Sequence, residues 1–166
     1  MTVKPHYLSE PHILGWLQAF SLPSDIVLDV GSGDRRYHDI PVKEIVTVDC
    51  WPLAEPDYLI DLDTADLPQG EFGVILLIDI LEHLSKERGL EILRQAQALA
   101  SRAVVVLTPL KWEENRDAYE DPQGFYFGNE HILHSSLWTL DDFGKDWVRV
   151  WLPSTQDCFM GYRVKR

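Results

Sequence analysis

A short stretch near the N-terminus has the residue types and spacing of a nucleoside-binding site. Asp29 and the glycines Gly31 and Gly33 end one apolar run, and Asp49 ends the next. Glycines let a ligand approach the backbone, and an acid about 20 residues further on can accept hydrogen bonds from ribose hydroxyls. The same residues can also serve the fold alone, since glycine permits a positive φ and an acid can cap a helix. Together, the two acids and two glycines predict a pocket for an adenosine-containing ligand.

The glycine turn lacks the features that bind phosphate. Arg36 stands where the GxGxxG dinucleotide fingerprint requires its third glycine, and no GxxxxGK[ST] sequence occurs. The remaining set suits a ligand with ribose and adenine but no polyphosphate. S-adenosylmethionine fits this description, and its cationic sulfonium suits an acidic site. A nicotinamide-dependent oxidoreductase is a weaker alternative because of Arg36.

These residues require a parallel sheet to hold them. Continuously apolar runs such as GVILLI and AVVVL are typical of central parallel strands buried on both faces. We expect an α/β fold, with a Rossmann-like open sheet of about seven strands that is mostly parallel and ends in a C-terminal antiparallel hairpin. The expected strands are residues 26–30, 45–48, 58–60, 73–78, 103–107, 147–152 and 158–165.

Helical spacing of apolar residues predicts the elements between the strands. Expected helices cover residues 11–20 (with Ser9 as N-cap), 85–100 and 139–143, with a short crossover helix between residues 33 and 45. We expect a single domain over residues 1–166, which begins with an N-terminal helical segment at 1–24. Residues 110–138 are polar, aromatic and long for a plain connection, which predicts a lid or substrate loop.

The composition limits the kinds of partner that we expect this protein to bind. The net charge is −12 and the pI is about 4.8, which argues against nucleic acid and anionic membranes as partners. No apolar run is long enough for a signal peptide or a membrane span, so we expect a cytoplasmic protein. Cys50 and Cys158 lack metal-site spacing and are expected to be unpaired thiols. No sequence motif indicates a metal, and none is expected.

Five segments resemble, in order, the motifs of class I S-adenosylmethionine-dependent methyltransferases. They are residues 27–33 (VLDVGSG), 46–49 (VTVD), 63–68 (DTADLP), 72–75 with 78–84 (FGVI, IDILEHL) and 104–109 (VVVLTP). The resemblance extends over residues 25–165. The sequence departs from the family pattern at Arg35 and Gly73, which replace a glycine and an aspartate, and at residues 100–102, which replace a glycine pair.

The resemblance implies S-adenosylmethionine as the cofactor and a set of residues that contact it. The implied contacts are Asp29, Gly31 and Gly33 for the amino-acid part, Asp49 for the ribose, Cys50, Trp51, Asp63 and Thr64 for the adenine, and Ile78 and Asp79 for the methionine side. Asp63 would accept from the adenine amine while the Thr64 N–H donates to the ring.

Histidines are the candidate catalysts, because imidazole titrates near neutrality and can act as a general base on a hydroxyl acceptor. His83 follows the fourth expected strand, and His131 lies in the 110–138 segment, which also carries His134. His83 can equally cap the following helix. His12 and His38 are expected at the surface.

The resemblance therefore implies methyl transfer to a small-molecule or sugar-like acceptor. The alternative is a catalytically inactive methyltransferase-like binding or interaction protein.

Overall fold

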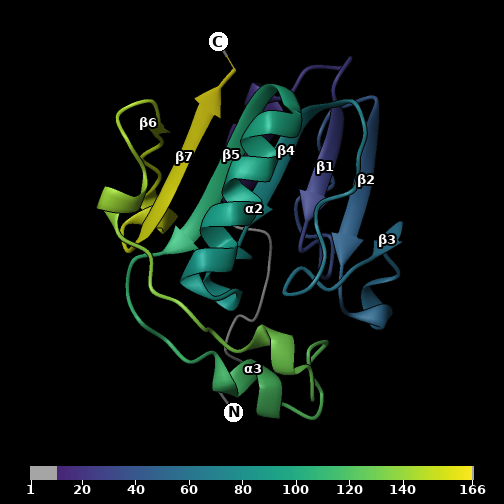
Figure 1. Ribbon diagram of the computed structural model, residues 1–166, viewed down its shortest axis with the longest axis vertical. Coiled ribbons are helices and arrows are strands. Elements are labelled where there is room, and N and C mark those ends of the chain that lie inside the picture. The colour runs from purple at the N-terminus through teal and green to yellow at the C-terminus, as the bar shows by residue number, and fades with distance from the viewer. Residues whose placement is uncertain (1–10, 166) are drawn as a thin grey trace.

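The computed structural model describes residues 11–165, so the expected N-cap Ser9 lies outside the described residues. One seven-stranded sheet has the order β3-β2-β1-β4-β5-β7-β6 (Figure 1). Its strands are β1 Ile26–Val30, β2 Glu44–Asp49, β3 Tyr58–Leu59, β4 Phe72–Ile78, β5 Ala100–Pro109, β6 Val148–Arg149 and β7 Cys158–Val164. Strands β1 to β5 pair in parallel, and β7 runs antiparallel to both β5 and β6. The expected fold class, including the antiparallel C-terminal pair, is confirmed.

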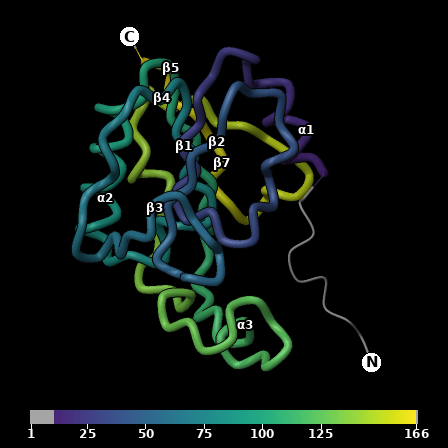
Figure 2. The backbone as a smooth tube through the Cα atoms, turned by 90° about the vertical axis from the view of Figure 1, so that its right-hand side faces the viewer, coloured from purple at the N-terminus to yellow at the C-terminus, as the bar shows by residue number. Residues whose placement is uncertain are grey.

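Helices cover the two faces of this sheet. Helix α1 (Pro11–Phe20) lies on one face and α2 (Lys86–Leu99) on the other, as the turned view of Figure 2 shows. Each helix packs on its own apolar cluster. Ile13 and Leu17 of α1 contact one cluster, and Ile92 and Ala96 of α2 contact the other. The continuously apolar strands are therefore explained by burial on both sides.

Helix α2 is fixed at its start by a cap and along its length by a close contact. The Ser85 hydroxyl accepts a hydrogen bond from the Arg88 N–H at 3.3 Å. Farther along, Gly89 packs on Trp138, which is fully buried. The contact anchors the end of the 110–138 segment to the side of the sheet that α2 covers.

Four expected elements differ from the observed ones. The connection between Gly33 and Glu44 consists of turns with no helix, since it is short and Pro41 interrupts it. Residues 139–143 form only a 3-10 turn, Leu140–Asp142, and the expected strand 147–152 pairs only at Val148–Arg149. Strand β3 is likewise shorter than expected.

The fold places a crevice where the strand order reverses. β1 and β4 are neighbours, and their connections leave in opposite directions along the sheet, which is where ligands bind in open α/β sheets. The 110–138 segment, with α3 (Arg116–Glu120), lies below the carboxyl ends of the strands in Figure 1. Within residues 11–165, no helix is both long and apolar enough to cross a membrane.

Candidate active site

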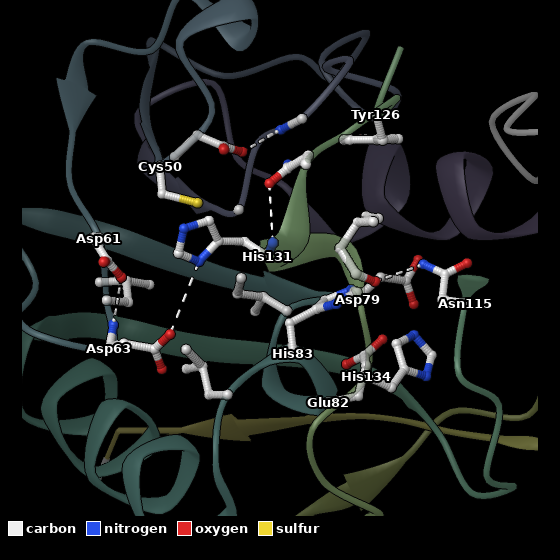
Figure 3. A pocket seen from close by; sticks show the side chains of 18 of the residues that line it. Cys50, Asp61, Asp63, Asp79, Glu82, His83, Asn115, Tyr126, His131 and His134 are labelled. Carbon is white, nitrogen blue, oxygen red and sulfur yellow. Dashed lines mark hydrogen bonds and ion pairs between the residues drawn. The ribbon is translucent and has the colours of Figure 1, made fainter. Parts of the chain in front are cut away.

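A cavity of about 270 Å³ lies at this crevice. Most residues around it come from the ends of β1, β2 and β4, from the loop after β3 and from the 110–138 segment, and Pro109 of β5 and Cys158 of β7 complete the lining. Arg36 supplies the guanidinium in the lining, which also holds six carboxyl side chains. The six are those of Asp49, Asp61, Asp63, Asp79, Glu82 and Glu113. Cys50, Asp61 and Asp63 lie toward one side of the cavity, and Asp79, Glu82 and His134 toward the other (Figure 3). The cavity is therefore an acidic site with two ends.

The glycine turn between β1 and β2 keeps a left-handed backbone. Gly31 and Gly33 have φ values of 74° and 47°, and Arg35 has φ of 60°. A Cβ on Gly31 would lie 2.8 Å from the Ile80 side chain, so glycine is required there. Arg35 adopts the conformation that glycine favours, and its guanidinium donates to the carbonyls of the loop after β2, at 3.2 Å to Ala54 and 2.6 Å to Glu55. Arg35 thus points away from the cavity.

Asp49, at the end of β2, is fixed by the turn itself. Its two carboxylate oxygens accept hydrogen bonds from the backbone N–H groups of Gly33, at 2.8 Å, and Trp51, at 2.7 Å. Burial raises the pKa of Asp49, although these hydrogen bonds oppose the rise. Each carboxylate oxygen has a second lone pair, so the group can still accept two ribose hydroxyls.

Several residues implied by the resemblance lie outside the cavity lining. Asp29 is buried and its carboxylate bonds the His38 ring at 2.8 Å, so His38 is half-buried and not at the open surface as expected. Ile78 is buried in the apolar cluster under α1. The Thr64 N–H, expected to reach an adenine ring, donates instead to the Asp61 carbonyl at 3.2 Å and closes a turn.

The structure does bring together Gly31, Gly33, Asp49, Cys50, Asp63, Asp79, His83 and His131 around the cavity. Trp51 lies beside them, where its indole N–H donates to the Phe125 carbonyl at 3.2 Å. This hydrogen bond ties the loop after β2 to the 110–138 segment.

Asp79 directly follows β4 and has a left-handed backbone, with φ of 50°. Its N–H still continues the sheet by donating to the Leu107 carbonyl at 2.9 Å. Burial raises the pKa of Asp79, and the nearby Arg36 guanidinium, 3.9 Å away, opposes the rise. The sequence analysis noted Arg36 because it replaces the third glycine of the dinucleotide fingerprint. In the structure, its guanidinium lines the cavity.

Glu82, His83 and His134 form a cluster beside Asp79. Glu82 is buried, and its pKa is well above the usual range because of burial and the nearby Asp79. Burial, with a smaller contribution from His134, lowers the pKa of His83 to about 4. The pKa of His134 is also lowered by burial. Both imidazoles are therefore neutral at pH 7, and their ring centroids are 4.8 Å apart.

The 110–138 segment forms part of the cavity wall. Tyr126 is buried and lies so close to Gly33 that a Cβ there would collide with its hydroxyl. Burial raises the pKa of Tyr126 to about 12. His131 sits on the opposite side, with its Nδ1 3.9 Å from the Asp63 carboxylate (Figure 3). The segment thus contacts both the glycine turn and the loop after β3.

The sheet order, the terminal antiparallel pair and the position of the cavity define the class I S-adenosylmethionine-dependent methyltransferase fold. No protein-family model matches the chain, and no curated protein matches it. The chain does match solved structures of other proteins. The N-methyltransferase NodS from Bradyrhizobium japonicum WM9 is 14% identical over 94% of each chain, with a TM-score of 0.57.

Two further structures show how widely the fold is used. Magnesium protoporphyrin IX methyltransferase from Synechocystis PCC 6803, solved with bound SAH, is 16% identical over 93% of this chain and 80% of that one, with a TM-score of 0.59. A putative Zn-dependent alcohol dehydrogenase from Rhodobacter sphaeroides is 14% identical over 92% and 88%, with a TM-score of 0.62. At these identities the likeness concerns the fold, and function must be argued from the site.

Proposed function

We propose that this protein transfers a methyl group from S-adenosylmethionine to a small-molecule or sugar-like acceptor. The observation that carries this proposal is the acidic cavity at the point where the strand order reverses. Six carboxyl groups against one guanidinium suit a cationic sulfonium and repel a pyrophosphate. A nicotinamide cofactor is disfavoured for this reason, although the fold alone admits it.

The donor set fits the cofactor along the length of the cavity. Asp49, held by two backbone N–H groups, would bind the ribose hydroxyls. Asp63 and Cys50 line the adenine side. The amino-acid part would then lie toward Gly31 and the pair formed by Asp79 and Arg36, which offer one charge for the ammonium and one for the carboxylate. The cofactor supplies an electrophilic methyl group to a nucleophile in the remaining space.

The acceptor would occupy the end of the cavity that holds Glu82, His83 and His134. In the transfer, the acceptor atom forms a bond to the methyl carbon while the carbon–sulfur bond breaks and its electron pair returns to sulfur. Catalysis of this step consists mainly of alignment and exclusion of water. His83 is neutral and contacts this end, but a pKa of about 4 makes it a weak base.

His131 has a different proposed role. It lies in the 110–138 segment beside Asp63, on the adenine side of the cavity. We assign it to closing the segment over the cofactor and not to proton transfer. Tyr126 closes the other side, over the glycine turn.

Isothermal titration calorimetry with S-adenosylmethionine and S-adenosylhomocysteine tests the cofactor assignment. Asp49→Ala should weaken binding by about 1 to 3 kcal/mol, because it removes charge-assisted hydrogen bonds. Asp57→Ala is the matched control: Asp57 also accepts from a backbone N–H, that of Thr47 at 2.8 Å, but lies outside the cavity lining. It should cost stability and leave cofactor affinity unchanged.

Turnover separates an enzyme from a binding protein. Production of S-adenosylhomocysteine on a panel of hydroxylated acceptors supports the proposal. Absence of cofactor binding by the folded wild-type chain would refute it, and equal losses of affinity in the Asp49 and Asp57 variants would refute the ribose assignment.

A further inference from the structure

We propose that Glu82, His83 and His134 bind one divalent first-row transition-metal ion at the acceptor end of the cavity. No motif in the sequence indicates this site, because Glu82 and His83 follow β4 while His134 belongs to the 110–138 segment. The fold brings one potential ligand atom from each residue within 4.8 Å of the others. Figure 3 shows the three side chains gathered beside Asp79.

The backbone holds the two parts of this cluster together. The carbonyl of Glu82 accepts hydrogen bonds from the N–H groups of Ser135 and Ser136, at 2.7 and 3.0 Å. These bonds place His134, the preceding residue, against His83. An ion with bonds of about 2.1 Å needs ligand atoms about 3.0 to 3.4 Å apart, so a small inward movement of the side chains would complete the site.

Each of the three side chains is also held by a second partner, as metal ligands usually are. His83 Nδ1 lies 3.4 Å from the Leu133 carbonyl, which can only accept, and in the tautomer that donates this hydrogen bond Nε2 carries the lone pair that an ion needs. His134 has a hydrogen bond to the backbone of Glu113. Glu82 accepts from the Thr108 hydroxyl at 3.0 Å and keeps further lone pairs for an ion.

The chemistry of the set indicates the kind of ion. Two imidazoles and one carboxylate suit zinc, iron, cobalt or nickel better than calcium or magnesium, which prefer all-oxygen ligands. Three protein ligands leave coordination positions open, which is typical of sites that also bind a substrate. The group faces the cavity, so these positions are open to an acceptor.

The position of the ion indicates which class of acceptor the site would take. This assignment of the acceptor, unlike the ion site itself, rests on the proposed function. An acceptor hydroxyl bound to the ion would lose its proton to solvent water at lower pH than a free hydroxyl. The oxygen would then form the bond to the methyl carbon as the carbon–sulfur bond breaks. The expected acceptors are molecules with two neighbouring oxygens that can chelate the ion, and His83 would need no role as a base.

Cobalt titration tests the ion site without any turnover. Tag-free protein freed of metal with a chelator is titrated with Co²⁺, and the visible absorption of the bound ion is followed. Zn²⁺ is then added in competition, and the bound metal is counted by elemental analysis. The expected result is one ion per chain, with His134→Ala weakening binding by at least about 100-fold. Thr108→Val, which removes only the partner of Glu82, should weaken it by about 10- to 100-fold.

His131→Ala is the matched control because His131 belongs to a rival group with Asp61 and Asp63, whose ligand atoms are also close together. Its Co²⁺ affinity should equal that of the wild type. Absence of a saturable Co²⁺ signal in the wild type overturns the inference, as does binding that His131→Ala abolishes and His134→Ala leaves intact.

Circular dichroism confirms folding of each variant, and Glu82→Gln replaces His134→Ala in the titration if the latter fails to fold. Calorimetry with S-adenosylmethionine is run separately. Cofactor binding without Co²⁺ binding contradicts the ion site alone, and Co²⁺ binding without cofactor binding contradicts the proposed function alone.

Discussion

Replacing Glu82 by glutamine should stabilise the metal-free protein at pH 8. Glu82 is 2% exposed and lies beside Asp79, and both effects raise its pKa well above the usual range. At pH 8 the native state must therefore either keep a buried carboxylate beside Asp79 or hold a proton that the unfolded state releases, and both cost stability. Glutamine has the same shape, and its amide oxygen can accept the Thr108 hydroxyl that Glu82 accepts at 3.0 Å.

The magnitude follows from the cost of a buried charge. Even a buried ion pair, in which the charges attract, can be replaced by hydrophobic residues of similar volume at no cost or with a gain of up to about 4 kcal/mol. Glu82 lies beside a like charge, so removal of its charge should be at least as favourable. One hydrogen bond to Glu82 is retained but is weaker when neutral, so we expect about 1 to 3 kcal/mol. For a chain of this size that corresponds to a rise in Tm of about 3 to 10 °C.

The sign of the pH dependence is opposite to that of an ordinary salt-bridged acid. Because the native pKa of Glu82 is raised, the native state binds more protons than the unfolded state above the usual glutamate pKa. Wild-type stability therefore falls as pH rises through the native pKa. His83, whose pKa is lowered to about 4, makes the native state lose stability as pH falls below about 6.5. His83 is present in both proteins, so the difference between variant and wild type isolates the effect of Glu82.

Urea denaturation at pH 5 and pH 8, with a chelator present, measures this difference. The advantage of Glu82→Gln should be largest at pH 8 and shrink at pH 5, because pH 5 lies close to the ordinary glutamate pKa and the native and unfolded states then differ less in bound protons. Glu91→Gln is the matched control: Glu91 is 48% exposed and pairs with Arg88 at the surface, so its change should stay within about 0.5 kcal/mol. An equal advantage at both pH values, or none at pH 8, would refute the argument.

Two further substitutions test the packing around the cavity. Gly89→Ala should destabilise by about 1 to 3 kcal/mol in urea denaturation, because its Cβ would lie 2.7 Å from a ring carbon of the buried Trp138. The matched change Gly15→Ala in α1 meets nothing within 4 Å and should stabilise by about 0.5 to 1 kcal/mol. Tyr126→Ala should speed S-adenosylmethionine association in stopped-flow fluorescence, because it uncovers the glycine turn. An unchanged association rate would show that Tyr126 does not obstruct entry.

The sheet could be predicted from the sequence because its signals are local. The apolar runs of β1, β4 and β5 and the acids at the ends of β1 and β2 mark both the strands and the edge where a ligand binds. Asp49 reaches the cavity for the same reason, since the carboxyl ends of parallel strands meet at one edge.

The positions of Asp29 and His134 could not be predicted from the sequence, because hydrogen bonds between separate segments determine them. Asp29 also ends a strand, but its carboxylate bonds His38 and does not line the cavity. His134 reaches His83 only because the chain after it is bonded to the Glu82 carbonyl. Such pairings leave no periodic pattern, so the ligand cluster could not be found from motif spacing.

Positive backbone φ values also occur around the proposed site. Within residues 11–165, four non-glycine residues have positive φ: Arg35, Glu55, Asp79 and Asn115. Each such residue costs about 1 to 3 kcal/mol and persists only where the surrounding structure enforces it. Asp79 and Asn115 line the cavity, and the Arg35 side chain bonds the Glu55 carbonyl to brace the glycine turn. Asp and Asn adopt this backbone conformation more readily than other side chains do, and at positions 79 and 115 it places them at the proposed site.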